Sequence, residues 1–325
     1  MTALHLVGWD DEDFAALRNS QQAELRALYG DDDIGHDMAG HDILDVVLLR
    51  DDGAAVACGA LRDAPELGAG TGELKRMYVV PSHRGRGLSG RVVDELEALA
   101  RRRGLARLVL ETGVLQAAAI GLYLAKGYLP IDRFPPYQDE SSSRAFAKDL
   151  AAPAPVRPRT ENGVDGLVVD RLAWLDPEAV ALRREMAAFL RGLYGAVGWF
   201  ADDEAQAATD AAEAHRALVV LVVRDGGTSL GTVTLSAAPE DRPADWGELE
   251  RLLVLPAARG RGVARLMLRA VEDEARARGM SALTLSTGYR QHPAIAMYLA
   301  AGYRIVAPVG DWASQDRILW FAKSL

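Results

Sequence analysis

The sequence contains a single cysteine, Cys58. One thiol excludes an intrachain disulfide, and it also excludes a metal site built from several thiolates. No run of apolar residues approaches the roughly 20 that span a bilayer, so we expect no membrane association through such a segment. Residues 1–9 lack a basic stretch followed by an apolar one, which predicts no secretory signal and a cytoplasmic location.

An excess of positive charge is also lacking. The chain has 37 Lys and Arg against 46 Asp and Glu, a formal net charge of −9. This balance disfavours binding to phosphate polymers, and we expect no nucleic-acid partner. Hydrophobic residues make up 49% and aromatic residues 6%, which is typical of a globular protein. The length of 325 residues predicts two domains of about 150 residues each.

An internal repeat defines the domain organisation. The segment GELKRMYVVPSHRGRG at Gly72–Gly87 returns as GELERLLVLPAARGRG at Gly247–Gly262, a shift of 247 − 72 = 175. Over the 58 positions of Gly72–Leu129 and their partners, 27 are identical by count, against about 4 expected by chance. Because the repeat covers so much of each half, we predict two domains, residues 1–150 and 163–325, joined by a proline-rich linker at 151–162.

The order of predicted elements indicates an α/β fold in each half, with a mixed sheet. An opening strand leads to a helix capped by an acidic residue, Asp10 or Asp11 in one half and Asp176 in the other. Two strands flank an Asp-Gly turn, and a fourth strand follows and ends at a proline. A helix, a fifth strand, a second helix and a last strand complete each domain. Strands alternate with helices only in the middle, which is why the sheet is expected to be mixed.

The Arg-Gly-Arg-Gly segments are the most informative chemically, because each lies between the fourth strand and a helix. The first helical N–H groups have no partner inside the helix, and together with the helix dipole they form a site for an anion. Glycines allow a close approach to the backbone. A P-loop is excluded because no Gly-Lys-Ser/Thr follows, and the third glycine of a dinucleotide fingerprint is also absent.

With these motifs on both halves, the sequence resembles the GNAT superfamily of N-acetyltransferases, whose signature is Arg/Gln-x-x-Gly-x-Gly/Ala. The second half fits as Arg259, Gly262 and Ala264, whereas the first has Arg84 and Gly87 with Ser89 at the last position. The resemblance implies two tandem acyl-CoA N-acyltransferase domains with acetyl-CoA as cosubstrate and no metal. It places acetyl-CoA against Val79, Val80, Arg84, Gly85, Arg86, Gly87, Ser89, Gly90, Val254, Leu255, Arg259, Gly260, Arg261, Gly262, Ala264 and Arg265. It also implies that the fourth and fifth strands splay apart beside the thioester.

Four residues are candidates for proton transfer by the same resemblance. Glu73 and Glu248 begin the fourth strands and correspond to a general base, although surface ion pairs with Lys75 or Arg76 would explain Glu73 equally well. Tyr123 and Tyr298 correspond to the acid that protonates the departing thiolate. The alternative for these tyrosines is core packing.

Other polar residues are predicted to be structural. Tyr29 and Tyr194 end the first helix of each half, where a shared helix end is a better explanation than a substrate contact. His36, Asp37, His41 and Asp42 lack the spacing of a known metal site and are assigned to a solvated loop. The run at residues 101–103 consists of arginines near a helix end, and its first explanation is a solvated face, with a phosphate contact second.

These observations predict an N-acetyltransferase that acetylates a primary amine of a small molecule by direct attack, with a Glu base and a Tyr acid. A second hypothesis assigns catalysis to one half only and leaves the other as an acyl-CoA-binding or structural domain. The sequence is compatible with a monomer or a homodimer, because a tandem repeat can place two equivalent domains in one chain.

Overall fold

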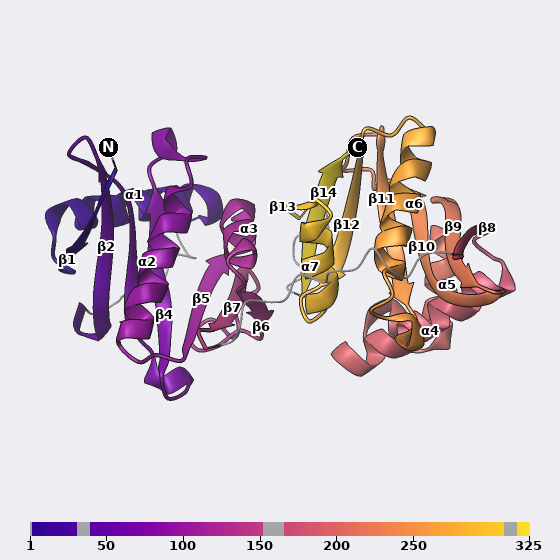
Figure 1. The fold of residues 1–325 in the computed structure, drawn as a ribbon, viewed down its shortest axis with the longest axis horizontal. Helices are drawn as coiled ribbons and strands as arrows, with labels where there is room; N and C mark the ends of the chain where they lie inside the picture. Colours follow the sequence, from indigo (N-terminus) through magenta and orange to yellow (C-terminus); the bar gives the residue numbers. More distant parts are fainter. Residues whose placement is uncertain (1, 31–39, 152–165, 309–316) are drawn as a thin grey trace. The chain divides into compact units, whose positions relative to one another are not determined.

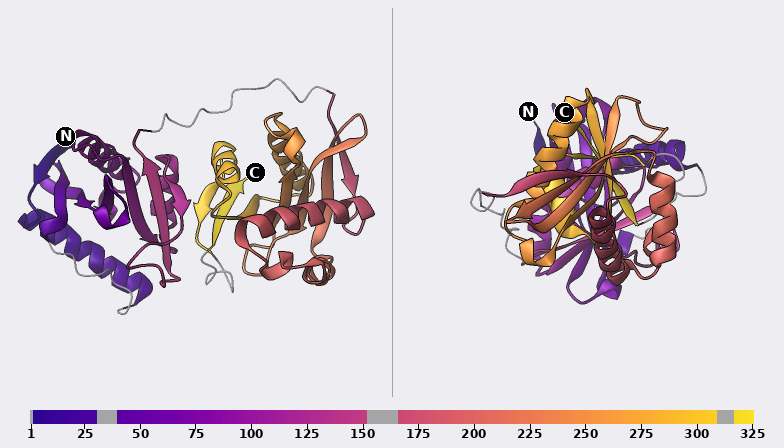
Figure 2. Two further views of the ribbon diagram at one scale, coloured as in Figure 1. Left: turned by 90° about the horizontal axis from the view of Figure 1, so that it is seen from below. Right: turned by 90° about the vertical axis from the view of Figure 1, so that its right-hand side faces the viewer.

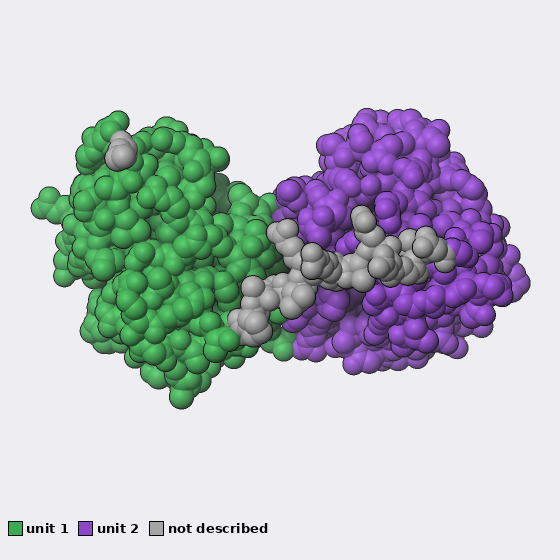
Figure 3. Space-filling view, viewed as in Figure 1, with its two compact units in different colours: residues 1–156, 313–316 green, residues 157–312, 317–325 purple. Residues whose placement is uncertain are grey.

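The computed structural model describes residues 2–30, 40–151, 166–308 and 317–325. The chain divides into two compact units, unit 1 with residues 1–156 and 313–316, and unit 2 with residues 157–312 and 317–325 (Figure 3). The predicted linker, apart from Ala151, lies outside the described residues. No helix in the described ranges is long and apolar enough to cross a membrane.

Unit 1 follows the predicted order of strands and helices (Figure 1). Its elements are β1 (Ala3–Val7), α1 (Glu12–Tyr29), β2 (Ile43–Asp51), β3 (Ala54–Asp63), β4 (Thr71–Val79), α2 (Leu88–Arg102), β5 (Arg107–Gly113), α3 (Ala117–Ala125), β6 (Leu129–Ile131) and β7 (Ser143–Asp149).

Unit 2 repeats this order with one additional helix, α5, after the first long helix. Its elements are β8 (Val168–Leu172), α4 (Pro177–Tyr194), α5 (Asp203–Glu213), β9 (Ala217–Asp225), β10 (Thr228–Ala237), β11 (Trp246–Val254), α6 (Val263–Ala277), β12 (Ala282–Gly288), α7 (His292–Ala300), β13 (Arg304–Val306) and β14 (Ile318–Ser324).

Each unit contains one seven-stranded mixed sheet, which confirms the predicted fold class. The order is β1-β2-β3-β4-β5-β7-β6 in unit 1, and unit 2 has the equivalent order β8-β9-β10-β11-β12-β14-β13. Among the described strands, only the central pairs, β4 with β5 and β11 with β12, are parallel. The short strands β6 and β13 and the helix α5 were not anticipated from the sequence.

Helices cover both faces of each sheet (Figures 1 and 2). In unit 1, Phe14 and Leu17 of α1 pack against a cluster that includes Cys58 and Ala60 of β3. Gly59, between them, faces the other side, where an added Cβ would lie 2.7 Å from Val92 of α2. Because successive strand residues point to opposite faces, α1 and α2 bury the two sides of the same strands.

Local signals explain where the helices begin and end. The side chain of Asp11 accepts a hydrogen bond from Phe14 N (3.0 Å), and Asp176 accepts one from Glu178 N (2.9 Å). These contacts confirm the predicted acidic caps, which satisfy amide groups that have no partner within the helix. Gly104 and Gly279 follow the ends of α2 and α6 with φ of 77° and 74°, a conformation that favours glycine.

Candidate active site

The Arg-Gly-Arg-Gly loop ends directly at the first turn of α2 in unit 1 and of α6 in unit 2. Arg91 N and Leu266 N donate to the carbonyl groups of Gly87 (3.2 Å) and Gly262 (3.1 Å), which closes the first helical turn. Within the described residues, no acceptor takes the amide hydrogens of residues 85–90 or 260–265. Such a run of unpaired N–H groups at a helix N-terminus provides the donors and the dipole that an anion requires.

The glycines of this loop are required for their backbone conformation. Gly85 and Gly87 have φ of 75° and 74°, and Gly260 and Gly262 have φ of 78° and 80°. An ideal Cβ built on Gly85, Gly87 or Gly260 would meet no atom within 4 Å. The space in front of the loop is therefore open, and what excludes other residues is the left-handed backbone. The site thus has both donors and room for a pyrophosphate.

The second arginine of each loop forms an ion pair within its own unit. Arg86 contacts Asp51 at 3.1 Å, and Arg261 contacts the equivalent Asp225 at 2.7 Å. Both aspartates end the second strand of their sheet. These arginines tie the loop to the neighbouring hairpin, which leaves the backbone amides as the candidate anion-binding groups.

The first arginine of each loop donates to the strand that precedes it. Arg84 Nε donates to the Val79 carbonyl (3.0 Å), and Arg259 Nε donates to the Val254 carbonyl (3.3 Å). Arg84 also pairs with Glu24 at 2.6 Å. In unit 2 the corresponding contact is aromatic, because the Arg259 guanidinium lies 5.2 Å from the Phe189 ring centre.

Positions at the start of the helices differ between the units. Ser89 and Ala264 occupy the final small position of the motif, in the first turn of α2 and α6. An added Cβ on Gly90 would lie 3.4 Å from Lys126 Cε, whereas Arg265 is exposed. The N–H groups of Val80 and Leu255 donate to Val56 and Leu230 within their sheets. A pantetheine chain would therefore pair with other backbone groups of the fourth strand.

The parallel strands separate beside this loop, as the resemblance implied. β4 pairs with β5 only from Thr71 to Leu74, although β4 continues to Val79. β11 pairs with β12 only from Trp246 to Glu248. Beyond these points no described strand pairs with β4 or β11 on that side.

A β-bulge accompanies the separation in both units. The register between β3 and β4 shifts at Cys58/Ala60, and the register between β10 and β11 shifts at Thr232/Thr234. The bulged residues Arg76 and Arg251 have φ of 56° and 54°, which is uncommon for residues other than glycine. Bulges bend a strand and increase its twist, so the paired arginines mark where each fourth strand turns away from its neighbour.

Glu73, the predicted base of unit 1, is held by two cations. Its Oε2 accepts from Arg62 Nε at 2.9 Å, and its Oε1 lies 3.0 Å from Lys75 Nζ. Only 2% of its surface is exposed. Lys75 also donates to the hydroxyl of Tyr137, which comes from the β6–β7 connection. A buried carboxylate with two ion pairs is held firmly in position.

Sequence reasoning missed a second carboxylate at this opening, Glu111 of β5. Burial raises its pKa to about 7, with further contributions from Glu140 and Glu73, while Ser143 and Lys75 act in the opposite direction. No ion pair of Glu111 is formed among the described residues of unit 1. Its position at the splay, two residues before Gly113, was the available signal. The second half has Ser286 at the equivalent position, so the internal repeat does not single out Glu111.

Tyr123 and Tyr298 come from α3 and α7 and are 4% exposed. Tyr123 packs edge-on against Tyr128, with ring centres 5.9 Å apart, and Tyr298 packs likewise on Tyr303 at 5.8 Å. Burial raises the pKa of both phenols, and for Tyr123 the charge of Glu111 adds to the effect. Both hydroxyl groups therefore stay protonated at neutral pH and can serve as donors, although they are weaker acids than a free phenol.

Unit 2 gathers three carboxylates at the corresponding place. Glu248, the predicted base, is 5% exposed and accepts a hydrogen bond from Arg216. Glu250 occupies the position equivalent to Lys75 and forms no ion pair with any described residue. Burial raises the pKa of Glu248 and of Glu250, and the proximity of other carboxylates raises both further. A proton is consequently held more readily by this pair than by a free glutamate.

The third carboxylate, Glu213, is supplied by α5. It pairs with Arg251 at 2.6 Å, and the Arg251 guanidinium lies 3.8 Å from the Trp199 ring centre. A buried pair positions the helix, because Asp210 Oδ2 accepts from Arg183 Nε at 2.9 Å. The cap Asp202, whose side chain accepts from Ala205 N (2.8 Å), was a signal for α5 in the sequence.

Tyr29 and Tyr194 tie the first helix of each unit to the end of the fifth strand. The Tyr29 hydroxyl accepts from Leu115 N (2.8 Å), and the Tyr194 hydroxyl accepts from Arg290 N (3.1 Å). A Cβ added to Gly113 would lie 2.1 Å from the Tyr29 hydroxyl oxygen, and one added to Gly288 would lie 2.1 Å from that of Tyr194. These contacts support the structural explanation for both tyrosines.

The remaining candidates are also engaged elsewhere. Each arginine of 101–103 pairs with a carboxylate of its own unit, Glu97, Glu95 or Asp45. His41 contacts Asp42 at 3.1 Å, whereas His36 and Asp37 lie outside the described residues. Where residues are described, no group of three or more potential ligands is placed to hold a metal ion.

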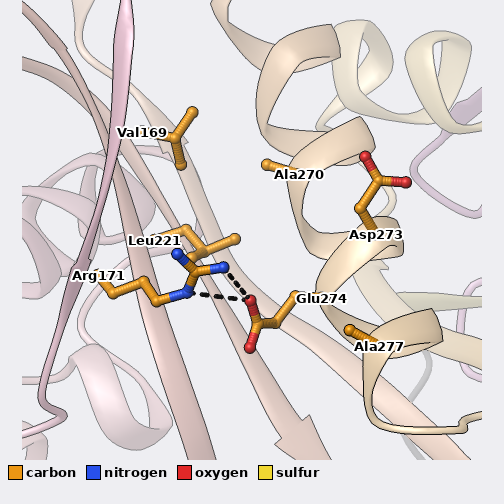
Figure 4. A pocket seen from close by; sticks show the side chains of 7 residues that line it. All are labelled: Val169, Arg171, Leu221, Ala270, Asp273, Glu274 and Ala277. Atoms are coloured by element: carbon orange, nitrogen blue, oxygen red, sulfur yellow. Dashed lines mark hydrogen bonds and ion pairs between the residues drawn. The ribbon is translucent and has the colours of Figure 1, made fainter.

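A surface hollow of about 230 Å³ lies between β8, β9 and α6 of unit 2 (Figure 4). Its polar contact is an ion pair, with Arg171 donating to Glu274 at 2.7 Å. Val169, Leu221 and Ala270 contribute apolar surface. Neither the Arg-Gly-Arg-Gly loop nor the separated strands contribute to its lining, so we do not assign chemistry to it.

Comparison with known proteins agrees with this geometry. The family model of the GNAT acetyltransferases matches twice, at residues 7–128 and 182–303. A segment of 104 residues, 32% of the chain, is 39% identical to an IAA acetyltransferase of Azospirillum brasilense and spans 67% of it. A segment of 85 residues, 26% of the chain, is 34% identical to an aminoalkylphosphonate N-acetyltransferase of Salmonella typhimurium, of which it spans 54%.

Among solved structures, a predicted acyl-CoA N-acyltransferase of Klebsiella pneumoniae is 34% identical with a TM-score of 0.40, and the match covers 46% of this chain and 98% of that one. The two family matches together extend over more than half of the chain and contain the Arg-Gly-Arg-Gly loop and the separated strands of both units. The chain therefore belongs to the GNAT family of acetyltransferases, with two GNAT domains in tandem.

Proposed function

We propose that each unit transfers an acetyl group from acetyl-CoA to a primary amine of a small molecule. The observation that carries the proposal is the run of unpaired amides at residues 85–90 and 260–265 beside an open strand edge. The amides would hold the pyrophosphate, and the free edges of β4 and β11 would hold the pantetheine arm. Family membership and a relative named for an aminoalkylphosphonate support an amine acceptor.

The reaction requires two proton movements that the site can supply. An amine with a pKa near 10 arrives as an ammonium, so a carboxylate at the opening must take one proton before nitrogen can attack. Attack forms the C–N bond as the C–S bond breaks. Tyr123 or Tyr298 then gives its proton to the thiolate sulfur and is reprotonated by the second hydrogen that leaves the nitrogen. Glu73 and Glu248 are the carboxylates that the family resemblance assigns to the first step.

The proposal is tested by measuring how many coenzyme A molecules bind per chain in variants whose loops carry an added negative charge. Ser89→Glu and Ala264→Glu each place a carboxylate in the first turn of α2 or α6, where it repels the pyrophosphate but suits the helix dipole. Calorimetry should find two sites in the wild type, one in each single variant and none in the double variant. Ser89→Gln and Ala264→Gln are matched controls that keep the added volume without the charge.

Acetyl transfer is then measured as thiol release with a panel of amines of different charge: 2-aminoethylphosphonate, putrescine and glycine. Turnover in both single variants supports two active units. Turnover in only one of them supports the alternative, in which the other unit binds acyl-CoA without catalysis. Coenzyme A binding that persists unchanged in the double variant would refute the assignment of the loops.

A further inference from the structure

One pair of positions flanks the opening between the parallel strands in each unit. In unit 1 the last paired residues are Leu74 and Leu110, so Lys75 and Glu111 come next on the separating strands. Tyr137 contacts Lys75 and packs in one cluster with Val109, which shares a strand face with Glu111. The side chains at these positions therefore lie on the same face of the sheet.

The equivalent residues of unit 2, at a shift of 175, are Glu250 and Ser286. They follow the last pair, Glu248 with Thr284, on the separating strands β11 and β12. At this pair of positions each unit thus has one carboxylate, Glu111 in unit 1 and Glu250 in unit 2. It comes from the fifth strand in unit 1 and from the fourth strand in unit 2.

Glu111 and Glu250 differ from the predicted bases, Glu73 and Glu248, in their ion pairing. Glu73 is held by Arg62 and Lys75, and Glu248 by Arg216. Glu111 and Glu250 have no ion pair within the described part of either unit. A carboxylate without a direct ion pair can accept a hydrogen bond from an incoming ammonium, whereas Glu73 and Glu248 already accept from fixed cations of their own unit.

We propose that Glu111 in unit 1 and Glu250 in unit 2 take the proton from the amine, and that Glu73 and Glu248 position the cations around them. The two units therefore perform the same step with carboxylates on opposite strands of the opening. The remaining positions fit this pattern. Lys75 corresponds to Glu250, and Ser286 corresponds to Glu111.

The electrostatic surroundings agree with the assignment of Glu111, whereas in unit 2 burial raises the pKa of both Glu250 and Glu248, that of Glu248 to about 8, so that ion pairing alone distinguishes them. Burial brings the pKa of Glu111 to about 7, close to the pH at which a general base is most effective. The groups that act on Glu111 are Lys75 and Glu73 of β4, Ser143 of β7, and Glu140 of the β6–β7 connection. The groups that act on Glu250 are Glu213 of α5, Ser236 of β10, and Arg216, Arg251 and Glu248.

The test uses the full chain with one unit silenced at its anion site. In the Ala264→Glu background only unit 1 binds acetyl-CoA, and Glu111→Gln is compared with Glu73→Gln. The pH profile of kcat/KM is measured with the best amine of the panel, and in the wild type it should fall below about pH 7, which is its acidic limb. Glu111→Gln should lower kcat/KM by roughly 10²–10⁴-fold and remove this acidic limb. Glu73→Gln should keep that limb. In the Ser89→Glu background, Glu250→Gln and Glu248→Gln should show the same contrast.

A rescue experiment gives unit 1 the residues of unit 2, by moving the carboxylate from the fifth strand to the fourth. Glu111→Ser should be slow, and Glu111→Ser with Lys75→Glu should recover activity because the free acid returns on β4. A double variant that keeps its circular dichroism spectrum and thermal stability but stays as slow as Glu111→Ser would contradict the proposal. So would an acidic limb that survives Glu111→Gln and disappears in Glu73→Gln.

A readout independent of turnover is the carboxyl ¹³C resonance that Glu111→Gln removes from the spectrum of glutamate-labelled protein. It should titrate near pH 7, and titration below pH 5 would overturn the assignment. The inference rests on the proposed function, but the two fail differently. Wild-type protein without coenzyme A binding or acetyl transfer refutes the function, whereas transfer that is insensitive to Glu111→Gln and Glu250→Gln refutes only the choice of base.

Discussion

Replacing Gly113 by alanine should destabilise unit 1 through one identifiable clash. An ideal Cβ at this position would lie 2.1 Å from the Tyr29 hydroxyl and 2.5 Å from its Cζ. Real Cβ atoms do not approach other atoms so closely, so the Tyr29 ring must move. The backbone of Gly113 is not in the left-handed region, and the effect is therefore steric alone.

The expected magnitude has two parts. Moving the ring breaks the hydrogen bond from Leu115 N to the Tyr29 hydroxyl, worth about 1 kcal/mol. Inserting a methyl group into a filled space costs about 1–3 kcal/mol. The sum of about 2–4 kcal/mol corresponds to a fall in Tm of roughly 4–16 °C for a domain of about 150 residues.

The assay is a double-mutant cycle followed by thermal and denaturant unfolding. Gly113→Ala is measured alone and together with Tyr29→Ala, which removes the ring that the methyl group would strike. In the Tyr29→Ala background the glycine substitution should cost less than about 0.5 kcal/mol, because the coupling is confined to these two side chains. Gly288→Ala with Tyr194→Ala gives the same cycle in unit 2, where the distance is also 2.1 Å. Equal destabilisation in both backgrounds would refute the clash.

Three further predictions concern the sites. Tyr123→Phe and Tyr298→Phe should each lower kcat of their unit while coenzyme A affinity by calorimetry stays the same, and unchanged kcat would remove the tyrosines from the mechanism. Glu111→Gln should become more stable relative to wild type as pH rises from 4.5 to 7, because burial raises the folded pKa of Glu111 from 4.5 to about 7. The gain should reach at most about 3 kcal/mol above pH 7 and vanish below pH 4.5, and denaturant unfolding at pH 4.5 and 8 checks this; a gain of equal size at both pH values would contradict it. Asp210→Ala leaves the buried Arg183, 2% exposed, without its carboxylate, which should cost roughly 3–5 kcal/mol; a loss below 1 kcal/mol on denaturant unfolding would show that this pair does not hold α5.

The sequence by itself determined the duplication and the position of the Arg-Gly-Arg-Gly loops. A gapless repeat, a proline after the fourth strand and an Arg-Gly-Arg-Gly turn are local patterns, and they depend on backbone chemistry that any fold must respect. The caps at Asp11 and Asp176 and the glycines at 104 and 279 are of the same kind. The separation of the parallel strands, β4 from β5 and β11 from β12, was expected only from the family resemblance.

Only the tertiary structure decided which acids at the opening form ion pairs with other described residues. Glu73 and Glu248 match in sequence, but their ionic partners come from different elements, Arg62 of β3 in one unit and Arg216, just before β9, in the other. Glu111 and Glu250 stand on different strands, and their relation appears only when β4 lies beside β5 and β11 beside β12. Burial and ion pairing depend on what is near in space, and a repeat in the sequence does not specify it, because partners on neighbouring strands can differ while the strands themselves stay the same.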